Sequence, residues 1–333
     1  MHLPSYRYTP RYLSGQSAWV QHLPFAYDLV SLVKPETVVE LGTWLGDSFF
    51  TFCQAVRDAQ ISTTCYAVDH WKGDEQAGAA SFSLFEVVQQ HCVQHYQSFA
   101  YLMKSDFNDA AHEFTPNTID LLHIDGFHSY ESVRNDFETW FPLVRDGGIV
   151  LFHDIKVRSN VIHQNFGVWK LWEELKTQHE TREFRQGFGL GILFKGTPPA
   201  NVEEWLEPEN FKILSDYYET RGSEIEKIAL TKSREIELNT MRRQHHALND
   251  RFEAQNANIA LLTAQIHRLE DACREKHAEN KILDQRMQAL NRKALQEKEK
   301  RVAKEKALKR VVKSAENWQR RSWFTRAFHK WRA

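Results

Sequence analysis

Short apolar, β-branched runs alternate with amphipathic stretches up to about residue 196. This alternation predicts a doubly wound α/β fold, in which helices cover both faces of a mostly parallel sheet. The predicted strands, each ending in polar or glycine-containing residues, are 37–41, 64–69, 100–104, 119–125 and 149–154. Two later runs, 183–186 and 189–195, flank Gly187-Phe188 and predict an antiparallel hairpin that closes the sheet.

The pattern changes after Pro198 and Pro199. We therefore expect a globular domain over residues 1–200 and a linker over 201–222. From Leu238 to Ala294 the seam positions step alternately by three and four residues, which predicts a long α-helical coiled coil over 223–303 that self-associates. A single amphipathic helix packed on the globular domain is the alternative. Polar residues within the seam, His245, Gln255 and Asn280, leave the oligomer number open.

The net charge of −1 hides an asymmetry. Residues 291–333 hold 15 Lys and Arg against four Asp and Glu, whereas the rest of the chain holds 28 against 40. Phe324, Phe328 and Trp331 share one face of a helix in the basic segment 304–333. Such a segment fits the anionic surface of a membrane. Nucleic acid is the rival partner, disfavoured because the rings cluster on one face.

The four cysteines show no paired spacing, and the first ten residues lack the features of a signal peptide. No apolar run approaches the roughly 18 residues that span a bilayer. We therefore expect a cytoplasmic protein, held peripherally on the inner face of the cell membrane.

A glycine-containing turn, Glu40-Leu41-Gly42-Thr43-Trp44-Leu45-Gly46, follows the first predicted strand. Glycines let the backbone approach a ligand closely, although an ordinary strand-to-helix turn shows the same pattern. Asp69 ends the next strand, where an acid can accept both hydroxyls of a ribose. The glycine-rich diphosphate motif is absent, which favours an adenosine ligand without phosphates, such as S-adenosylmethionine.

Two further segments carry a family resemblance: Ile119-Asp120-Leu121-Leu122-His123-Ile124-Asp125-Gly126-Phe127-His128-Ser129-Tyr130-Glu131, and 136–154, which ends in Phe152-His153-Asp154. With the turn, they resemble class I S-adenosylmethionine-dependent methyltransferases of the group typified by macrolide-sugar O-methyltransferases and related cephalosporin-biosynthesis proteins. The resemblance covers residues 15–196 and implies a Rossmann-like fold that methylates a hydroxyl. The predicted coiled coil lies outside it.

The resemblance also implies roles for individual residues. The cofactor-binding set comprises Glu40, Gly42, Thr43 and Gly46 around the methionine and ribose, Asp69 at the ribose, Ser105 and Asp106 at the adenine, and Asp125. Relatives often bind a divalent metal, Mg²⁺ or Mn²⁺, at positions that here are Asp125, His153 and Asp154. His153 stands where relatives have a carboxylate, and imidazole is a poorer ligand for Mg²⁺, so a metal-free site is the alternative.

The candidate general base is His128, three residues after Asp125. A hydroxyl is too weak an acid to attack a sulfonium at neutral pH without a base or a Lewis acid. A neutral imidazole can accept its proton, and Asp125 and Asp154 are alternative bases. The candidate catalytic pair is therefore His128 and Asp125.

The expected acceptor is a glycan or lipid-linked saccharide at the cell surface, because the predicted coiled coil and basic tail place a sugar-modifying domain near a membrane. Two alternatives stay open. One is a catalytically inactive head on a coiled-coil membrane scaffold, which is supported by His153 in the place of a carboxylate. The other is an O-methyltransferase of a small-molecule natural product.

Overall fold

The computed structural model describes residues 3–74, 78–79, 83–158, 165–275 and 281–320. The chain divides into two compact units, Met1–Ser233 and Arg234–Ala333. Among the described helices, none is both long and apolar enough to cross a membrane.

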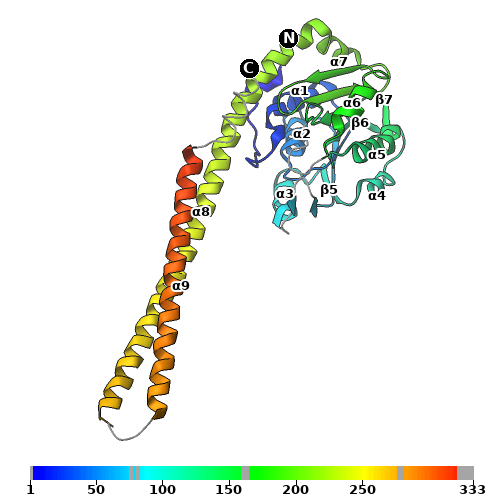
Figure 1. Cartoon of the computed structure of the whole chain (residues 1–333). Helices are drawn as coiled ribbons and strands as arrows, with labels where there is room; N and C mark the ends of the chain where they lie inside the picture. Colours follow the sequence, from blue (N-terminus) through cyan, green and yellow to red (C-terminus); the bar gives the residue numbers. More distant parts are fainter. Residues whose placement is uncertain (1–2, 75–77, 80–82, 159–164, 276–280, 321–333) are drawn as a thin grey trace. The chain divides into compact units, whose positions relative to one another are not determined.

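A seven-stranded sheet in the order β5-β2-β1-β6-β7-β9-β8 forms the centre of the first unit (Figure 1). Its strands are β1 (Thr37–Leu41), β2 (Thr64–Asp69), β5 (Ala100–Lys104), β6 (Ile119–Ile124), β7 (Val144–His153), β8 (Thr181–Phe184) and β9 (Leu190–Phe194). Neighbouring strands among β5, β2, β1, β6 and β7 pair in parallel, and β9 is antiparallel to β7 and β8. The predicted fold, strands and hairpin are confirmed, although β7 begins five residues earlier than predicted and β8 lies two residues earlier than the predicted 183–186.

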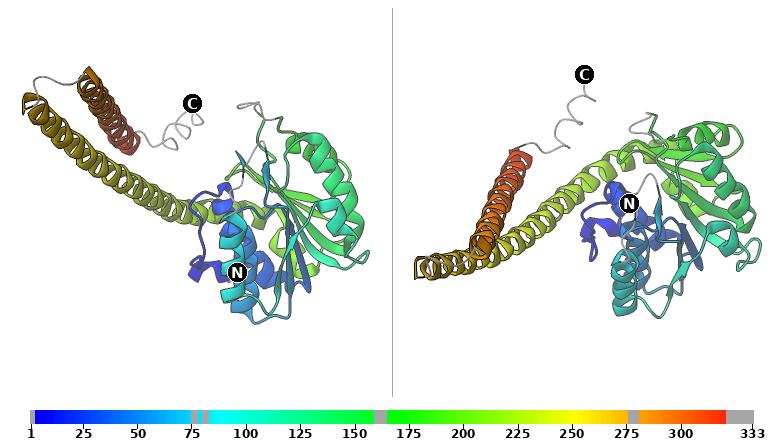
Figure 2. Two further views of the ribbon diagram at one scale, coloured as in Figure 1. Left: turned by 90° about the horizontal axis from the view of Figure 1, so that it is seen from below. Right: turned by 60° about the horizontal axis from the view of Figure 1, so that its bottom comes forward.

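Helices cover both faces of this sheet (Figure 2). One layer holds α1 (Leu23–Val33), α2 (Asp47–Ala59) and α3 (Ser83–His95); the other holds α4 (Phe107–Ala111), α5 (Tyr130–Trp140), η3 (Phe141–Leu143) and α6 (Val168–Leu175). Successive residues of a strand point to opposite faces, so Val38 enters the first layer and Val39 the second. A small antiparallel pair, β3 (Gly73–Asp74) and β4 (Gly78–Ala79), follows β2.

The segment expected to be a linker, 201–222, is helical and belongs largely to the first unit's core. It comprises α7 (Ala200–Trp205) and the start of α8 (Pro208–Glu275). The buried carboxylate of Asp28 accepts hydrogen bonds from Ser5 Oγ at 2.5 Å and from Tyr218 Oη at 2.8 Å. This joins α1 to α8 and to the N-terminal 3-10 helix η1 (Pro4–Arg7), which precedes η2 (Ala18–His22). The structural division therefore falls after residue 233 instead of near residue 200.

In the second unit, the end of α8 and α9 (Lys281–Arg320) are separate helices, between which residues 276–280 lie outside the described ranges. The seam predicted as one unbroken run is therefore distributed over two helices. Apart from the exposed His245, the seam positions whose burial is described are half-buried or buried, with Leu262 and Ile266 buried on α8. The Arg301 guanidinium lies 5.4 Å from the centre of the Phe252 ring, so α9 contacts α8 at a seam position. The predicted Asn280 and tail residues Phe324, Phe328 and Trp331 also lie outside the described ranges.

Candidate active site

The turn after β1 can form only because glycines occupy two of its positions. Gly42 has φ +87°, and a Cβ there would lie 2.0 Å from the carbonyl oxygen of Asp125. Gly46 has φ +85°, and its Cβ would contact the ring of Phe50. The Gly42 N–H donates to Val68 O at 2.9 Å. The turn thus lies directly against the carboxyl ends of β2 and β6, which is where open α/β sheets bind ligands.

Glu40 lies beneath this turn and is fully buried. Its Oε2 is 2.9 Å from Nδ1 of His123, which occupies the register position opposite Glu40 on β6. Neither Glu40 Oε1 nor His123 Nε2 has a hydrogen-bond partner among the described residues. His123 was not among the residues predicted from the sequence, because only the strand register shows that it faces Glu40.

Asp69 organises the loops around the turn. Its Oδ2 accepts from the Trp44 N–H at 2.8 Å, and its Oδ1 accepts from the Trp71 N–H at 2.7 Å. The Ser105 N–H donates to the Asp69 carbonyl at 3.1 Å, and the neighbouring Asp106 is exposed at the start of α4. The residues predicted to receive the ribose and the adenine therefore lie at the ends of adjacent strands, and their contacts with a ligand remain a prediction.

Three buried oxygens near the turn have no hydrogen-bond partner in the described part of the chain: Glu40 Oε1, Thr43 Oγ1 and Asp47 Oδ2. Burial raises the pKa of Asp47 to about 6, although the Ser14 N–H donates to its other oxygen. Unpaired buried acceptors are costly. A ligand that brings an ammonium, a sulfonium and ribose hydroxyls would relieve that cost, so the residues present fit S-adenosylmethionine.

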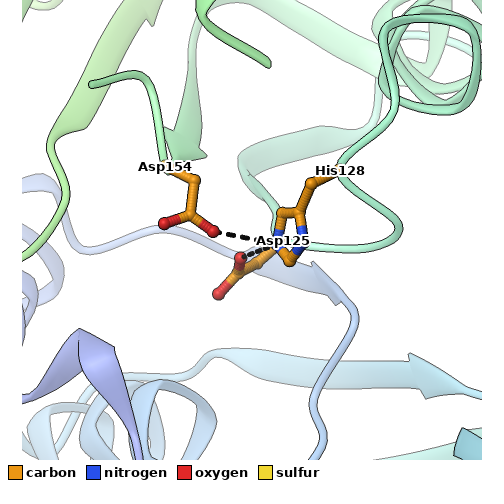
Figure 3. A group of neighbouring side chains, drawn as sticks. All are labelled: Asp125, His128 and Asp154. Carbon is orange, nitrogen blue, oxygen red and sulfur yellow. Dashed lines mark hydrogen bonds and ion pairs between the residues drawn. The ribbon is translucent and has the colours of Figure 1, made fainter. Parts of the chain in front are cut away.

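Asp125, His128 and Asp154 form a compact cluster beside the turn (Figure 3). His128 Nε2 lies 2.9 Å from Asp154 Oδ2 and 3.4 Å from Asp125 Oδ1. One potential ligand atom from each residue lies within 4.8 Å of the others. Asp125 follows β6, Asp154 follows β7, and His128 precedes α5, where its ring stacks on Phe166 at 4.8 Å. These groups can share a proton or bind a divalent cation.

The pKa values of the two histidines of this region are raised. Burial opposes the charged form of His128, but its hydrogen bonds to Asp125 and Asp154 outweigh burial and raise its pKa to about 10. Burial also opposes the charge on His153, and the carboxylates of Asp154 and Asp125 raise its pKa to about 9. Burial acts against ionisation of Asp125 as well, yet the two imidazoles hold its pKa well below the usual range.

His153 is oriented by protein atoms on both ring nitrogens. Nε2 donates to Gly187 O at 2.8 Å, while Nδ1 lies 3.3 Å from Asp125 Oδ1 and 3.6 Å from Asp154 Oδ1. The compact ligand set therefore contains His128, whereas the set predicted from the sequence contains His153. His22 Nε2, also absent from the sequence prediction, lies 3.2 Å from the same Gly187 oxygen, and burial lowers its pKa to about 3.

Comparison with known proteins gives a family match over part of the chain. Residues 39–155 match the model of a family described as a methyltransferase domain. The uncharacterized protein y4gI of Sinorhizobium fredii is 40% identical over 199 residues, which cover 60% of this chain and 21% of that protein. The uncharacterized protein R132 of Acanthamoeba polyphaga mimivirus is 31% identical over 121 residues, or 35% and 51% of the two chains. The chain thus spans about a fifth and about half of these relatives' lengths.

Two similar solved structures are O-methyltransferases by their descriptions. A putative caffeoyl-CoA O-methyltransferase from Staphylococcus aureus has a TM-score of 0.41 and 17% identity, over 52% of this chain and 82% of that chain. TomG from Streptomyces achromogenes, in complex with S-adenosylmethionine, has a TM-score of 0.40 and 14% identity, over 54% and 88%. Scores this low carry no weight, so the fold is established by the strand order itself. Residues 39–155, which match the methyltransferase-domain model, form most of the parallel part of this Rossmann-like sheet.

Proposed function

We propose that this chain is an S-adenosylmethionine-dependent O-methyltransferase that acts on a sugar hydroxyl. One observation carries the proposal: the glycine turn meets the backbone of Asp125, whose side chain belongs to the Asp125–His128–Asp154 cluster. A cofactor held by that turn would lie next to groups that can accept a proton. Methyl transfer needs both, because the attacking hydroxyl must lose its proton as the new bond forms.

The reaction balances with these residues in the following roles. The acceptor oxygen forms a bond to the methyl carbon, and the bond from that carbon to sulfur breaks with both electrons going to sulfur. The hydroxyl proton goes to His128 in its neutral form. Asp125 and Asp154 flank the imidazole and stabilise the imidazolium that results. Because these carboxylates also raise the pKa of His128, the neutral base becomes abundant only in alkaline solution.

A divalent metal at the cluster is the alternative to the free His128 base, because a ring nitrogen that binds a metal cannot also accept the hydroxyl proton. Asp125, His128 and Asp154 would hold it, and it would act as a Lewis acid toward the acceptor hydroxyl. A site with one imidazole and two carboxylates favours Mn²⁺ over Mg²⁺, which prefers oxygen ligands. Metal binding would also have to displace the proton of His128, so affinity should increase with pH.

The proposed acceptor is a glycan or lipid-linked saccharide near an anionic membrane. This is supported by the resemblance of residues 15–196 to sugar O-methyltransferases and by the basic C-terminal region. On α9, Leu295 and Val302 are exposed seven residues apart on the side away from the seam, with Lys306 and Arg310 exposed nearby. Apolar and cationic side chains together suit anionic lipid headgroups. Self-association through the seam remains part of the proposal.

The test is incubation of the full chain with S-adenosylmethionine labelled in its methyl group and the lipid-linked glycan fraction of the host. Label is expected in the glycan, with heat-killed protein as control. Calorimetry with S-adenosylmethionine separates the alternatives. A head that binds no cofactor is a scaffold, whereas label found only in low-molecular-weight products indicates a natural-product methyltransferase.

A further inference from the structure

The turn between β8 and β9 has an unusual backbone. Gly187, Phe188 and Gly189 all have positive φ, at +53°, +67° and +89°. Glycine adopts this left-handed conformation freely, but in other residues Cβ approaches the backbone carbonyl. A phenylalanine at such a position is therefore strained, and glycine or asparagine would serve the turn better.

The surrounding structure fixes every peptide of this turn. Gly187 O accepts from His153 Nε2 at 2.8 Å and lies 3.2 Å from His22 Nε2. Phe188 O accepts from the Lys156 N–H at 2.9 Å, and the Gly189 N–H donates to Gln186 O at 2.8 Å. The strained conformation is therefore imposed by contacts on both sides of Phe188.

The ring of Phe188 contributes little to the core in return. It is 52% exposed, and within the described ranges it is the most exposed phenylalanine. Strain and an exposed aromatic ring both reduce stability, and local features that reduce stability without a packing gain are characteristic of functional positions. The other bulky residues with positive φ, Trp44 and Trp71, also lie at the carboxyl edge of the sheet, beside the cofactor turn.

The location of this turn connects it to the acid–base cluster. His153 donates to Gly187 O, and its other ring nitrogen lies 3.3 Å from Asp125 Oδ1. Phe188 is thus the next residue after Gly187, whose carbonyl is linked to Asp125 through the side chain of His153. Leu190 pairs with His153 at the end of β7, and Phe188 O accepts from the N–H of Lys156, two residues after Asp154, so this turn lies at the same carboxyl edge of the sheet as the cluster.

We infer that Phe188 is the docking platform for the acceptor, against which the apolar face of the sugar ring stacks. This inference rests on the proposed function and adds a recognition element to it. The apolar C–H face of a sugar and the face of an aromatic ring both pack on a phenyl ring. A platform of fixed position also orients one hydroxyl toward the base, which is a large part of catalysis by proximity.

The experiment compares Phe188→Gly with Phe188→Tyr, which keeps the ring. Removing the ring should lower transfer at limiting acceptor at least tenfold, while Phe188→Tyr stays within threefold of wild type. Affinity for S-adenosylmethionine should change less than twofold in both variants. Because glycine relieves the left-handed strain, Phe188→Gly should raise Tm by roughly 2–4 °C. If Phe188 had a purely structural role, its replacement would not lower activity while raising Tm.

Gln60→Gly is the matched control. Gln60 is also a non-glycine residue with φ +54°, at the exposed end of α2 away from the cluster, so its replacement should raise Tm without changing transfer. Two acceptor probes, the lipid-linked glycan fraction and catechol, distinguish a sugar from an aromatic ring as the stacking partner.

The outcomes separate this inference from the proposed function. Wild-type transfer that Phe188→Gly leaves unchanged overturns the docking role and leaves the methyltransferase intact. A fall in Tm together with activity assigns Phe188 a structural role instead. Wild-type protein that binds cofactor but labels neither probe overturns both the acceptor proposal and the platform.

Discussion

His128 Nε2 lies 2.9 Å from Asp154 Oδ2, which makes a histidine and a carboxylate from different loops one electrostatic unit. Asp125 completes it from the opposite side at 3.4 Å. The unit holds a proton on His128 in the ligand-free protein, since its pKa is raised to about 10. Stability, catalysis and metal binding should therefore all depend on the same proton.

The first prediction concerns stability against pH. Because the pKa of His128 is higher in the folded than in the unfolded chain, where it is about 6.5, the stabilisation is fully present below pH 6.5 and disappears as the pH rises to about 10. Guanidinium unfolding between these pH values should show wild type losing about 2 kcal/mol more than His128→Gln. His153 contributes in the same direction in both proteins. Equal slopes would show that His128 carries no linked proton.

Loss of the His128 imidazole should affect turnover and not cofactor binding. His128→Ala is expected to lower the rate of methyl transfer by about 10²–10⁴-fold, the usual contribution of a general base. Its affinity for S-adenosylmethionine, measured by calorimetry, should stay within twofold of wild type. In wild type without added metal, the rate should rise with pH toward about 10, as His128 becomes neutral. Wild-type turnover in His128→Ala would refute the assignment.

Chelation tests the proposed metal. If the cluster acts through a metal instead of through free His128, exhaustive dialysis against EDTA should lower activity at least tenfold, and Mn²⁺ should restore more of it than Mg²⁺ because His128 offers a nitrogen ligand. In calorimetry, Asp154→Asn should bind Mn²⁺ more weakly than wild type. The affinity of wild type for Mn²⁺ should increase from pH 6 to pH 8. Full activity after chelation, with no metal found by elemental analysis, would rule out a metal requirement.

The sequence predicted the sheet well because its strands are short β-branched runs bounded by turns, and the ends of β1, β2 and β5 were located to the residue. It also pointed to Asp125, His128 and Asp154 before their proximity was visible. His123 and His22 were missed, since their partners Glu40 and Gly187 are distant in sequence and become neighbours only through strand register and the hairpin turn. Local patterns do not encode such contacts.

The same limitation explains the helical region. Heptad spacing continues from Leu238 to Ala294 without a proline or glycine, so nothing in it marks the end of α8 at Glu275. Likewise, the prolines near residues 201–222 predict a linker. The burial of Tyr218 against Asp28 depends on α1, which lies about 190 residues earlier in the chain.

The buried Glu40–His123 pair should be fragile to single changes. His123→Ala leaves the Glu40 carboxylate buried without its partner and is expected to cost about 3–5 kcal/mol of unfolding free energy. The double variant Glu40→Met, His123→Met should recover most of that loss, because two apolar side chains replace both partners of the buried polar pair. If Glu40 contacts the cofactor, the double variant folds but binds S-adenosylmethionine at least tenfold more weakly. Wild-type affinity in the folded double variant would assign Glu40 a purely structural role.

Neighbouring leucines on α8 test whether the heptad seam holds the second unit together. Leu262 occupies a seam position and is 6% exposed, whereas Leu261 is 60% exposed. Leu262→Asp places a carboxylate in the contact face, where an unpaired charge is strongly unfavourable, and should lower the helical circular dichroism signal of the full chain. Leu261→Asp makes the same chemical change outside the seam and should leave that signal within a few per cent of wild type.

An equal loss of helical signal in both variants would contradict a role of the seam in holding the second unit together. Light scattering on the same samples shows whether the seam also joins two chains. If the molar mass of the particle falls for Leu262→Asp but not for Leu261→Asp, the seam also mediates association between chains, because the two variants carry the same substitution and differ only in its position.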